Sequence, residues 1–355
     1  MRASHESVSA SAAGAARVLV VGVNWLGDSI MTLPALEALR RRRPGVRLVL
    51  LVKPALAPLW GLYPGAEAVL PLAEGLGGTW RTARAVRAGR FPEALVLPHS
   101  FRSALIPFLA GVPIRRGLCG HGRDWMLTEA LRPAPRPGRG HQMDEYLQLL
   151  APEAGDELPA VPWLVVPEGP RRAAEARLAA PGPVVGFFPG AAYGPSKRWP
   201  AERFGAVGCR LAAERGCRVA IFGSPRDAAA AAQVAAQVGP AALNLAGRTT
   251  LTDLAALLTG CAVVLGNDSG GLHLAAALGV PVVGIFGITD PAKTGPLGGR
   301  QRVLMAPGWD RRRDVPRVSA AAAAALAAIS ADAAYAAVGD LLGPAPAKAQ
   351  EVPHA

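Results

Sequence analysis

The chain has 355 residues, of which 51% are hydrophobic, so it is long enough for two domains of ordinary size. No apolar run reaches the ~18 residues of a membrane-spanning helix, and residues 1–16 lack the apolar core of a signal peptide. The four cysteines have no Cys-x-x-Cys spacing, which argues against a zinc site and against a disulfide framework. We therefore expect a cytoplasmic protein.

The net charge of +12 is concentrated in the first 150 residues, which hold 19 Lys and Arg against 10 Asp and Glu. A basic half indicates an anionic partner, such as nucleic acid, an acidic membrane surface or a phosphorylated substrate. The alternative is that the excess charge has no partner and is only the solvated surface of an arginine-rich chain. Nucleic acid is a poor candidate, because only 5% of the residues are aromatic and no nucleic-acid-binding motif is present.

The first half alternates short apolar runs with helical segments, which predicts a parallel, doubly wound sheet. Strands are expected at 18–23, 47–52, 68–72 and 94–97. Helices are expected at 29–43, 55–63, 80–89 and 141–150. After Pro98 we expect a loop, a helix and then an edge strand, and residues 133–140 and 152–170 are expected to be linkers rich in proline.

The turn after the first strand carries a carboxylate, Asp28, at the start of a helix. Its spacing from Gly22 and Gly27 matches the phosphate-binding loop GxxxxGK[ST], except that Asp28 replaces the lysine. A carboxylate there repels a triphosphate, so nucleotide hydrolysis is a poor interpretation. Asp28 is then either a site residue at the carboxyl end of a strand or simply an acidic residue at a helix N-terminus.

The second half repeats the alternation of strands and helices. Strands are expected at 184–187, 218–222, 262–265 and 282–286. Helices are expected at 201–215, 252–258, 272–278 and 320–342. Lys197 and Arg198 lie in a Gly/Pro turn just before a helix, a position that suits a diphosphate contact. His99, Ser100 and Arg102 follow the fourth strand of the first half, so we expect them near the cleft between the two halves.

A glycine turn in the second half, Asp268-Ser269-Gly270-Gly271, leads from a buried strand into a helix. The free N–H groups at a helix start and the helix dipole favour an anion, and glycine leaves room for a phosphate. The alternative is an ordinary turn in which Asp268 and Ser269 cap the helix.

These features predict a first domain at 17–165, a second domain at 166–343, and disordered tails at 1–16 and 344–355. The helix at 320–342 belongs to the second domain, with packing back onto the first domain as the alternative.

Four motifs of the second half together resemble the bacterial ADP-heptose:lipopolysaccharide heptosyltransferases of glycosyltransferase family 9. They are FPGAAYGPSKRWP, FGSPRD, LNLAGRTTLTDLAALLTGC and GNDSGGLHLAAALGVPVVGIFG. In the first half, VVGVNWLGDSIMTLPALEALRRRRPG is similar to the family's opening and LPHSFRSALIPFLAGVPIRRGL to the heptosyltransferase II branch. The resemblance implies a GT-B fold, in which two Rossmann-like domains face each other across a cleft. Residues 305–319 depart from the family pattern, being short and without the cysteines of some relatives.

The resemblance also implies inverting transfer of heptose from ADP-heptose, with no bound metal and no cofactor. It makes Asp28 the general base that deprotonates the acceptor hydroxyl. The donor site is expected to comprise Lys197 and residues 269–271 at the diphosphate, with Asp227 at the ribose and the Thr249 backbone at the adenine. Asp268 and His273 belong to the same motif and are also expected at the donor, with His273 facing the sugar phosphate. An isolated histidine at such a position would more often be structural.

The expected acceptor is the anionic heptosyl-Kdo-lipid A of the lipopolysaccharide inner core. It places the enzyme peripherally on the cytoplasmic face of the inner membrane. The residues expected to contact the acceptor are Asn24, His99, Ser100, Arg102, Arg115 and Arg116. Two alternatives remain: a family-9 enzyme with a protein, another glycan or a small molecule as acceptor, and a GT-B sugar-nucleotide epimerase.

Overall fold

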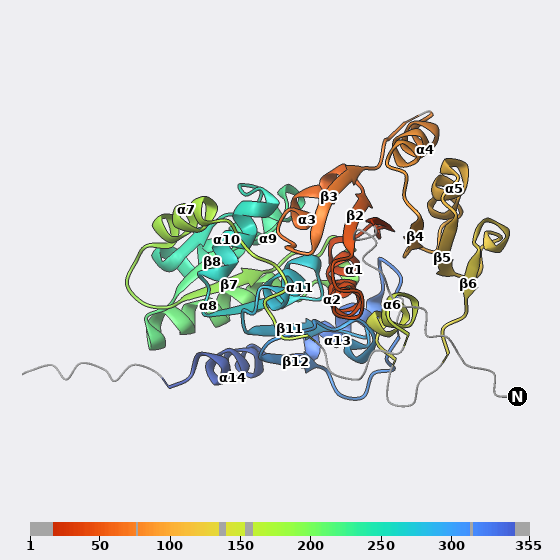
Figure 1. Cartoon of the computed structure of the whole chain (residues 1–355). Coiled ribbons are helices and arrows are strands. Elements are labelled where there is room, and N and C mark those ends of the chain that lie inside the picture. The colour runs from red at the N-terminus through yellow and green to blue at the C-terminus, as the bar shows by residue number, and fades with distance from the viewer. Residues whose placement is uncertain (1–16, 76, 135–139, 153–158, 313–314, 345–355) are drawn as a thin grey trace, which may run out of the picture.

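The computed structural model describes residues 17–75, 77–134, 140–152, 159–312 and 315–344, so the expected tails lie outside the described residues except for Pro344. Two parallel six-stranded sheets form two halves (Figure 1). The first sheet has the order β3-β2-β1-β4-β5-β6. Its strands are β1 (Arg17–Val21), β2 (Arg47–Val52), β3 (Ala66–Pro71), β4 (Glu93–Val96), β5 (Ile114–Leu118) and β6 (Glu129–Leu131).

The helices of the first half are α1 (Leu26–Met31), α2 (Leu33–Arg42), α3 (Ala57–Trp60), α4 (Gly78–Ala88), α5 (Phe101–Ala110) and α6 (Gln142–Leu150). The single helix expected at 29–43 is two helices that meet at Thr32, because Pro34 has no N–H for a continuous helix. The strand expected at the edge, β5, pairs with β4 on one side and with β6 on the other. The edge strand is the three-residue β6, which is too short to show an apolar pattern.

The second sheet has the order β12-β11-β10-β7-β8-β9. Its strands are β7 (Val184–Phe188), β8 (Arg218–Ile221), β9 (Ala242–Asn244), β10 (Val263–Asn267), β11 (Val282–Phe286) and β12 (Gln301–Met305). The helices are α7 (Glu168–Leu178), α8 (Ala201–Arg215), α9 (Ala228–Val238), α10 (Leu251–Thr259), α11 (Gly270–Ala277), α12 (Pro291–Thr294), α13 (Ala320–Ala328) and α14 (Ala331–Leu342). The helices α7, α9 and α12 and the strands β9 and β12 have no counterpart among the sequence expectations. The expected linker at 152–170 is wrong at its end, because α7 begins at Glu168.

The two sheets have the same strand order when each is counted from its first strand. In each sheet the order reverses beside the first strand, and loops diverge there to leave a crevice at the carboxyl ends of the strands. Asp28 follows β1, Lys197 follows β7 and Asp268 follows β10. All three therefore lie next to a reversal point.

The Ala-rich segment 320–342 is two helices that meet at an angle of 61°, not one. The break lies at Ser330, whose hydroxyl accepts a hydrogen bond from the Ala333 N–H and so caps α14. Both helices pack in the core of the second half, through Ala322, Leu326 and Val338 among others. In the described part of the chain no single helix is long and apolar enough to cross a membrane, although this bent pair meets the length and composition criteria jointly.

Candidate active site

A cavity of about 780 Å³ lies between the two halves and is lined by residues from both. The first half contributes Trp25, Leu26, Gly27, Asp28, Met31 and Gln142. Every donor-site residue expected from the sequence lines this cavity: Asp227, Thr249, Lys197, Asp268, Ser269, Gly270, Gly271 and His273. The volume lies in the usual range for small-molecule sites.

The helices α1 and α11 pack against each other at this cavity, and both begin there (Figure 1). A Cβ on Gly270 would lie 2.9 Å from the Leu26 Cβ, and one on Gly271 would lie 2.3 Å from the Phe188 ring. The two glycines are therefore required for close packing in the protein itself, in addition to the room for a phosphate that we expected of them. The result is that Asp28, in the first turn of α1, and the start of α11 face one cavity.

Lys197 is a cationic residue that lines the cavity. Its Nζ donates a hydrogen bond of 2.5 Å to Oδ2 of Asp268 and lies 5.4 Å from the centre of the Tyr193 ring. The Asp268 side chain is buried and that of Lys197 nearly so. The Asp268 carboxylate and the Tyr193 ring restrict the long, flexible side chain of Lys197. Its ammonium group is therefore positioned to bind an anion at the start of α11.

A buried amide, Asn267 at the end of β10, fixes the loop that carries Lys197. Its Nδ2 donates to the Pro189 carbonyl at 2.8 Å, and its Oδ1 accepts from the Trp199 N–H at 3.0 Å. These two bonds hold both ends of the loop after β7 against the neighbouring strand. The sequence analysis missed this role, because the contact joins segments almost 70 residues apart in the chain.

Four buried polar atoms of residues that line the cavity have no hydrogen-bond partner among the described residues: Asp227 Oδ1, Ser269 Oγ, His273 Nδ1 and Thr294 Oγ1. Ser269 occupies the N-cap position of α11, but its hydroxyl makes no capping bond. The alternative interpretation, in which Ser269 only caps the helix, is therefore wrong for this residue. Because buried polar groups are normally paired, these atoms are candidates for contact with a bound ligand.

His273 is buried in α11, with Nε2 4.0 Å from Oδ1 of Asp268. Burial lowers the pKa of His273 to about 4; Asp268 opposes that shift, whereas His141 and Lys197 add to it. The imidazole is thus neutral at pH 7 and can donate one hydrogen bond without adding charge to the site.

We expect the wild type to lose more thermal stability than His273→Gln as the pH falls from about 6.5 to about 4. In that window the unfolded chain binds a proton at residue 273 that the folded protein does not bind. Stability contributed by the neutral imidazole is therefore complete above about pH 6.5 and declines below it. Melting temperatures of both proteins across this range check the difference. Parallel curves would contradict the neutral assignment.

Asp227 ends the 3₁₀ turn η4 (Pro225–Asp227) after β8, at the part of the cavity that also includes Thr249. Its Oδ2 accepts hydrogen bonds from the Ser224 N–H and hydroxyl at 2.9 and 2.7 Å. Its Oδ1 is buried without a hydrogen bond among the described residues, and the Arg198 guanidinium lies 3.7 Å away. One carboxylate oxygen is thus fixed, while the other can accept a hydrogen bond from a ligand hydroxyl.

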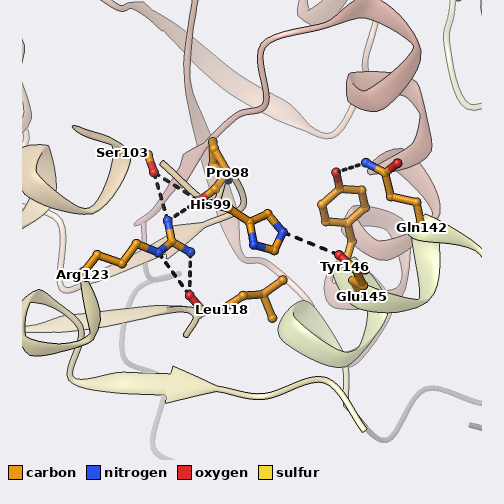
Figure 2. Close-up of polar contacts among 8 residues, drawn as sticks. All are labelled: Pro98, His99, Ser103, Leu118, Arg123, Gln142, Glu145 and Tyr146. Carbon is orange, nitrogen blue, oxygen red and sulfur yellow. Dashed lines mark hydrogen bonds and ion pairs between the residues drawn. The ribbon is translucent and has the colours of Figure 1, made fainter. Parts of the chain in front are cut away.

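The six residues expected to contact the acceptor lie outside the lining of this cavity. His99 and Ser100 are exposed in the loop after β4, and His99 Nε2 lies 3.6 Å from a Glu145 carboxylate oxygen of α6 (Figure 2). Figure 2 also shows how the loop is held: the buried Arg123 donates to the carbonyls of Pro98 and Leu118 and to the Ser103 hydroxyl. Burial lowers the pKa of this guanidinium.

The three candidate arginines all bind other parts of the protein. Arg102 donates to the Ala73 carbonyl, Arg115 to the Met126 carbonyl, and Arg116 pairs with Glu129 at 2.6 Å. Arg102 is exposed, whereas Arg115 and Arg116 are half-buried. Of the remaining candidates, Asn24 is exposed in the turn before α1, next to the N-cap residue Trp25. Contact of these residues with an acceptor stays a prediction.

Several residues that line the cavity were missed by the sequence analysis: Trp25, Gln142, Tyr193, Thr294 and Arg317. Gln142 is the first residue of α6, and its amide donates to the Tyr146 hydroxyl at 2.9 Å. Arg317 belongs to the segment 305–319 and has its guanidinium 5.9 Å from the Tyr193 ring centre. Gln142, Thr294 and Arg317 come from segments whose position relative to the cavity depends on the tertiary fold. Trp25 and Tyr193 lie in the same strand-end turns as Asp28 and Lys197, so their place after a strand could have indicated them.

Comparison with known proteins identifies the family. Residues 79–320 match the profile of glycosyltransferase family 9 (heptosyltransferase). The chain is 32% identical to lipopolysaccharide heptosyltransferase 2 of Salmonella typhimurium, over 81% of this chain and 87% of that protein. It is 31% identical to lipooligosaccharide heptosyltransferase 2 of Haemophilus influenzae, over 81% of this chain and 88% of that protein.

Among solved structures, the E. coli ADP-heptose lipopolysaccharide heptosyltransferase II superposes with a TM-score of 0.80 at 28% identity. The superposition covers 92% of this chain and 98% of that structure. The GT-B fold expected from the sequence is thereby confirmed. A profile match over more than half of the chain, together with these relatives, shows that the chain is a glycosyltransferase and belongs to glycosyltransferase family 9, the heptosyltransferases.

Proposed function

We propose that this protein transfers heptose from ADP-heptose to the inner core of lipopolysaccharide, with heptosyl-Kdo-lipid A as the acceptor. The observation that carries the proposal is the cavity between the domains, which joins Asp28 to the Lys197–Asp268 pair at the start of α11. The heptosyltransferase names of the relatives support the choice of sugar.

In the proposed reaction the diphosphate of the donor lies at Lys197 and at the N–H groups that begin α11. These groups stabilise the negative charge that builds on the leaving ADP, a task that a divalent cation performs in many other transferases. We therefore expect transfer to proceed without a bound metal or cofactor. Asp227 accepts hydrogen bonds from the ribose, and the backbone at Thr249 contacts the adenine.

Asp28 acts as the general base. It takes the proton of the acceptor hydroxyl while that oxygen forms a bond to the anomeric carbon and the bond from that carbon to the ADP oxygen breaks. Attack on the face opposite ADP inverts the anomeric configuration. The basic first domain attracts the anionic acceptor at the cytoplasmic face of the inner membrane, where the enzyme associates peripherally, and Asn24, His99, Ser100 and Arg102 are candidate contacts. We include Arg115 and Arg116 only as contributors to the positive field, because both are half-buried and bind other parts of the protein, whereas Arg102 is exposed.

Product analysis tests the acceptor. Purified protein is incubated with ADP-heptose and, separately, with Kdo-lipid A, heptosyl-Kdo-lipid A and a protein acceptor, and each acceptor is analysed by mass spectrometry. The proposal predicts the addition of one heptose residue to heptosyl-Kdo-lipid A. Heptose on the protein acceptor alone would establish the alternative family-9 activity, and an altered donor sugar without any acceptor would establish an epimerase.

A further inference from the structure

Three exposed aromatic side chains form a cluster on the first domain: Phe101 and Phe108 of α5, and Trp125 of the 3₁₀ turn η2 (Asp124–Met126). The ring centre of Trp125 lies 5.1 Å from that of Phe108 and 6.4 Å from that of Phe101. Trp125 is 62% exposed, Phe101 45% and Phe108 37%. We call these residues the aromatic cluster. Contiguous apolar surface of this kind usually marks an interaction site.

The helix that carries the aromatic cluster is apolar on both faces. Ala104, Ile106 and Ala110 on its inner face pack in the core beneath it. The outer face presents Phe101 and Phe108 at positions i and i+7, and the partly buried Leu105 between them also packs against this core. Arg102 is the one charged residue in α5. A helix that is apolar all round is normally covered on both sides, and the described residues leave the outer side open.

Arginines flank the aromatic cluster. Arg87 of α4 donates to the carbonyls of Leu109 and Ala110 at the end of α5, Arg102 follows Phe101, and the Arg115 guanidinium lies 5.5 Å from the Phe108 ring centre. We call Arg87, Arg102 and Arg115 the flanking arginines.

Few acidic groups oppose the flanking arginines. Glu93 is buried and pairs with Arg43, Glu129 pairs with Arg116, and Asp124 is exposed and accepts a hydrogen bond from the Gly120 N–H. These are the acidic residues between Gly78 and Leu131. The rim of the aromatic cluster is therefore cationic.

We infer that the aromatic cluster and the flanking arginines form a docking surface for an anionic lipid bilayer. Tryptophan and phenylalanine enter the boundary between headgroups and acyl chains, while arginine keeps its charge at the lipid phosphates and lays its stem against apolar surface. The cationic rim complements the negative surface of such a membrane. A protein partner remains an outcome of the test.

This inference rests on the proposed function, which needs a lipid-linked acceptor. The loop with His99 and Ser100 leads directly into Phe101, so docking through α5 brings that loop to the membrane surface. α4 and α5 lie on the side of the first domain away from the second domain, so docking leaves the second domain unobstructed (Figure 1).

Vesicle co-sedimentation of the full chain tests the docking surface. Vesicles of phosphatidylcholine alone are compared with vesicles that also contain phosphatidylglycerol. We expect the wild type to bind the anionic vesicles and to be released by salt, and the variant Phe101→Ser/Phe108→Ser/Trp125→Ser to bind at least about tenfold more weakly. Val165→Ser is the matched control, because Val165 is an exposed apolar residue outside the aromatic cluster and should not affect binding.

The same variant keeps heptose transfer to a deacylated, water-soluble acceptor, which separates docking from catalysis. Wild-type binding by the triple variant, with an unchanged melting temperature, would overturn the docking surface and leave the proposed function intact. The docking surface would also be overturned if the wild type bound neutral and anionic vesicles equally well, or if it bound neither. Self-association through the aromatic cluster, detected by sedimentation and lost in the variant, would assign the surface to a protein partner instead.

Discussion

Asp28→Asn is expected to reduce turnover by roughly 10²–10⁴ while the affinity for ADP-heptose stays nearly unchanged. The amide has almost the same shape as the carboxylate but cannot accept the acceptor's proton. Because Asp28 lies in the first turn of α1 and lines the cavity from the first half, we expect the substitution to leave Lys197 and α11 in place. Steady-state rates and calorimetric donor binding measure the two effects.

Asp332→Asn is the matched control for this experiment. Asp332 also lies in the first turn of a helix, α14, but is exposed, pairs with Arg210 and does not line the cavity. Both substitutions remove a favourable charge from a helix N-terminus, worth about 0.3–1 kcal/mol of stability. Equal, near-normal turnover of the two variants would show that Asp28 is only an acidic residue at a helix start.

Lys197→Ala is expected to reduce turnover by roughly 10²–10³ and to weaken donor binding about tenfold or more. The substitution removes the charge that meets the leaving diphosphate, and ADP release with a saturating acceptor measures the loss. Lys293→Ala is the control, because Lys293 is an exposed lysine of the same domain outside the cavity lining. EDTA should change the rate little. Loss of activity in EDTA that Mg²⁺ or Mn²⁺ restores would contradict a lysine-based role.

The alanine variant also leaves the buried Asp268 carboxylate without its partner, which destabilises the fold. The double variant Lys197→Met/Asp268→Asn separates the two effects, because it removes both charges and keeps the side-chain volumes. We expect it to melt closer to the wild type than Lys197→Ala does, and to remain as slow in transfer. Recovery of turnover together with stability would show that Lys197 serves the fold alone.

Much of the fold could be predicted from the sequence, because buried parallel strands are continuous apolar runs. The strand at 282–286 and the helix at 201–215 have the expected bounds. Several elements could not be predicted. The helix α9 consists of Ala, Gln and Val and shows little polar contrast, and β9 and β12 carry polar or half-buried residues. The helix α7 begins inside the segment 152–170, whose prolines indicated an extended linker. The two broken helices depend on local features, the missing N–H of Pro34 in the first and the Ser330 cap in the second.

The donor side of the site could be located because each of its residues follows a strand, and strands of a parallel sheet place their carboxyl ends at one edge. Asn267 could not be assigned its role, because its hydrogen bonds reach a loop almost 70 residues away. The positions of Gln142 and Arg317 at the cavity could not be predicted for the same reason. The number of arginines indicated that the first domain is basic. Only the folded structure shows that Arg115 and Arg116 bind other parts of that domain.

The central claim is that this glycosyltransferase couples breakdown of ADP-heptose to an acceptor hydroxyl. Its most direct test is the rate of ADP release from ADP-heptose with and without heptosyl-Kdo-lipid A, at equal enzyme concentration. We predict rapid release only when the acceptor is present, equal in amount to the heptose gained by the acceptor, and loss of that release in Asp28→Asn. Release that is independent of the acceptor, or an acceptor that gains no heptose, would contradict the account.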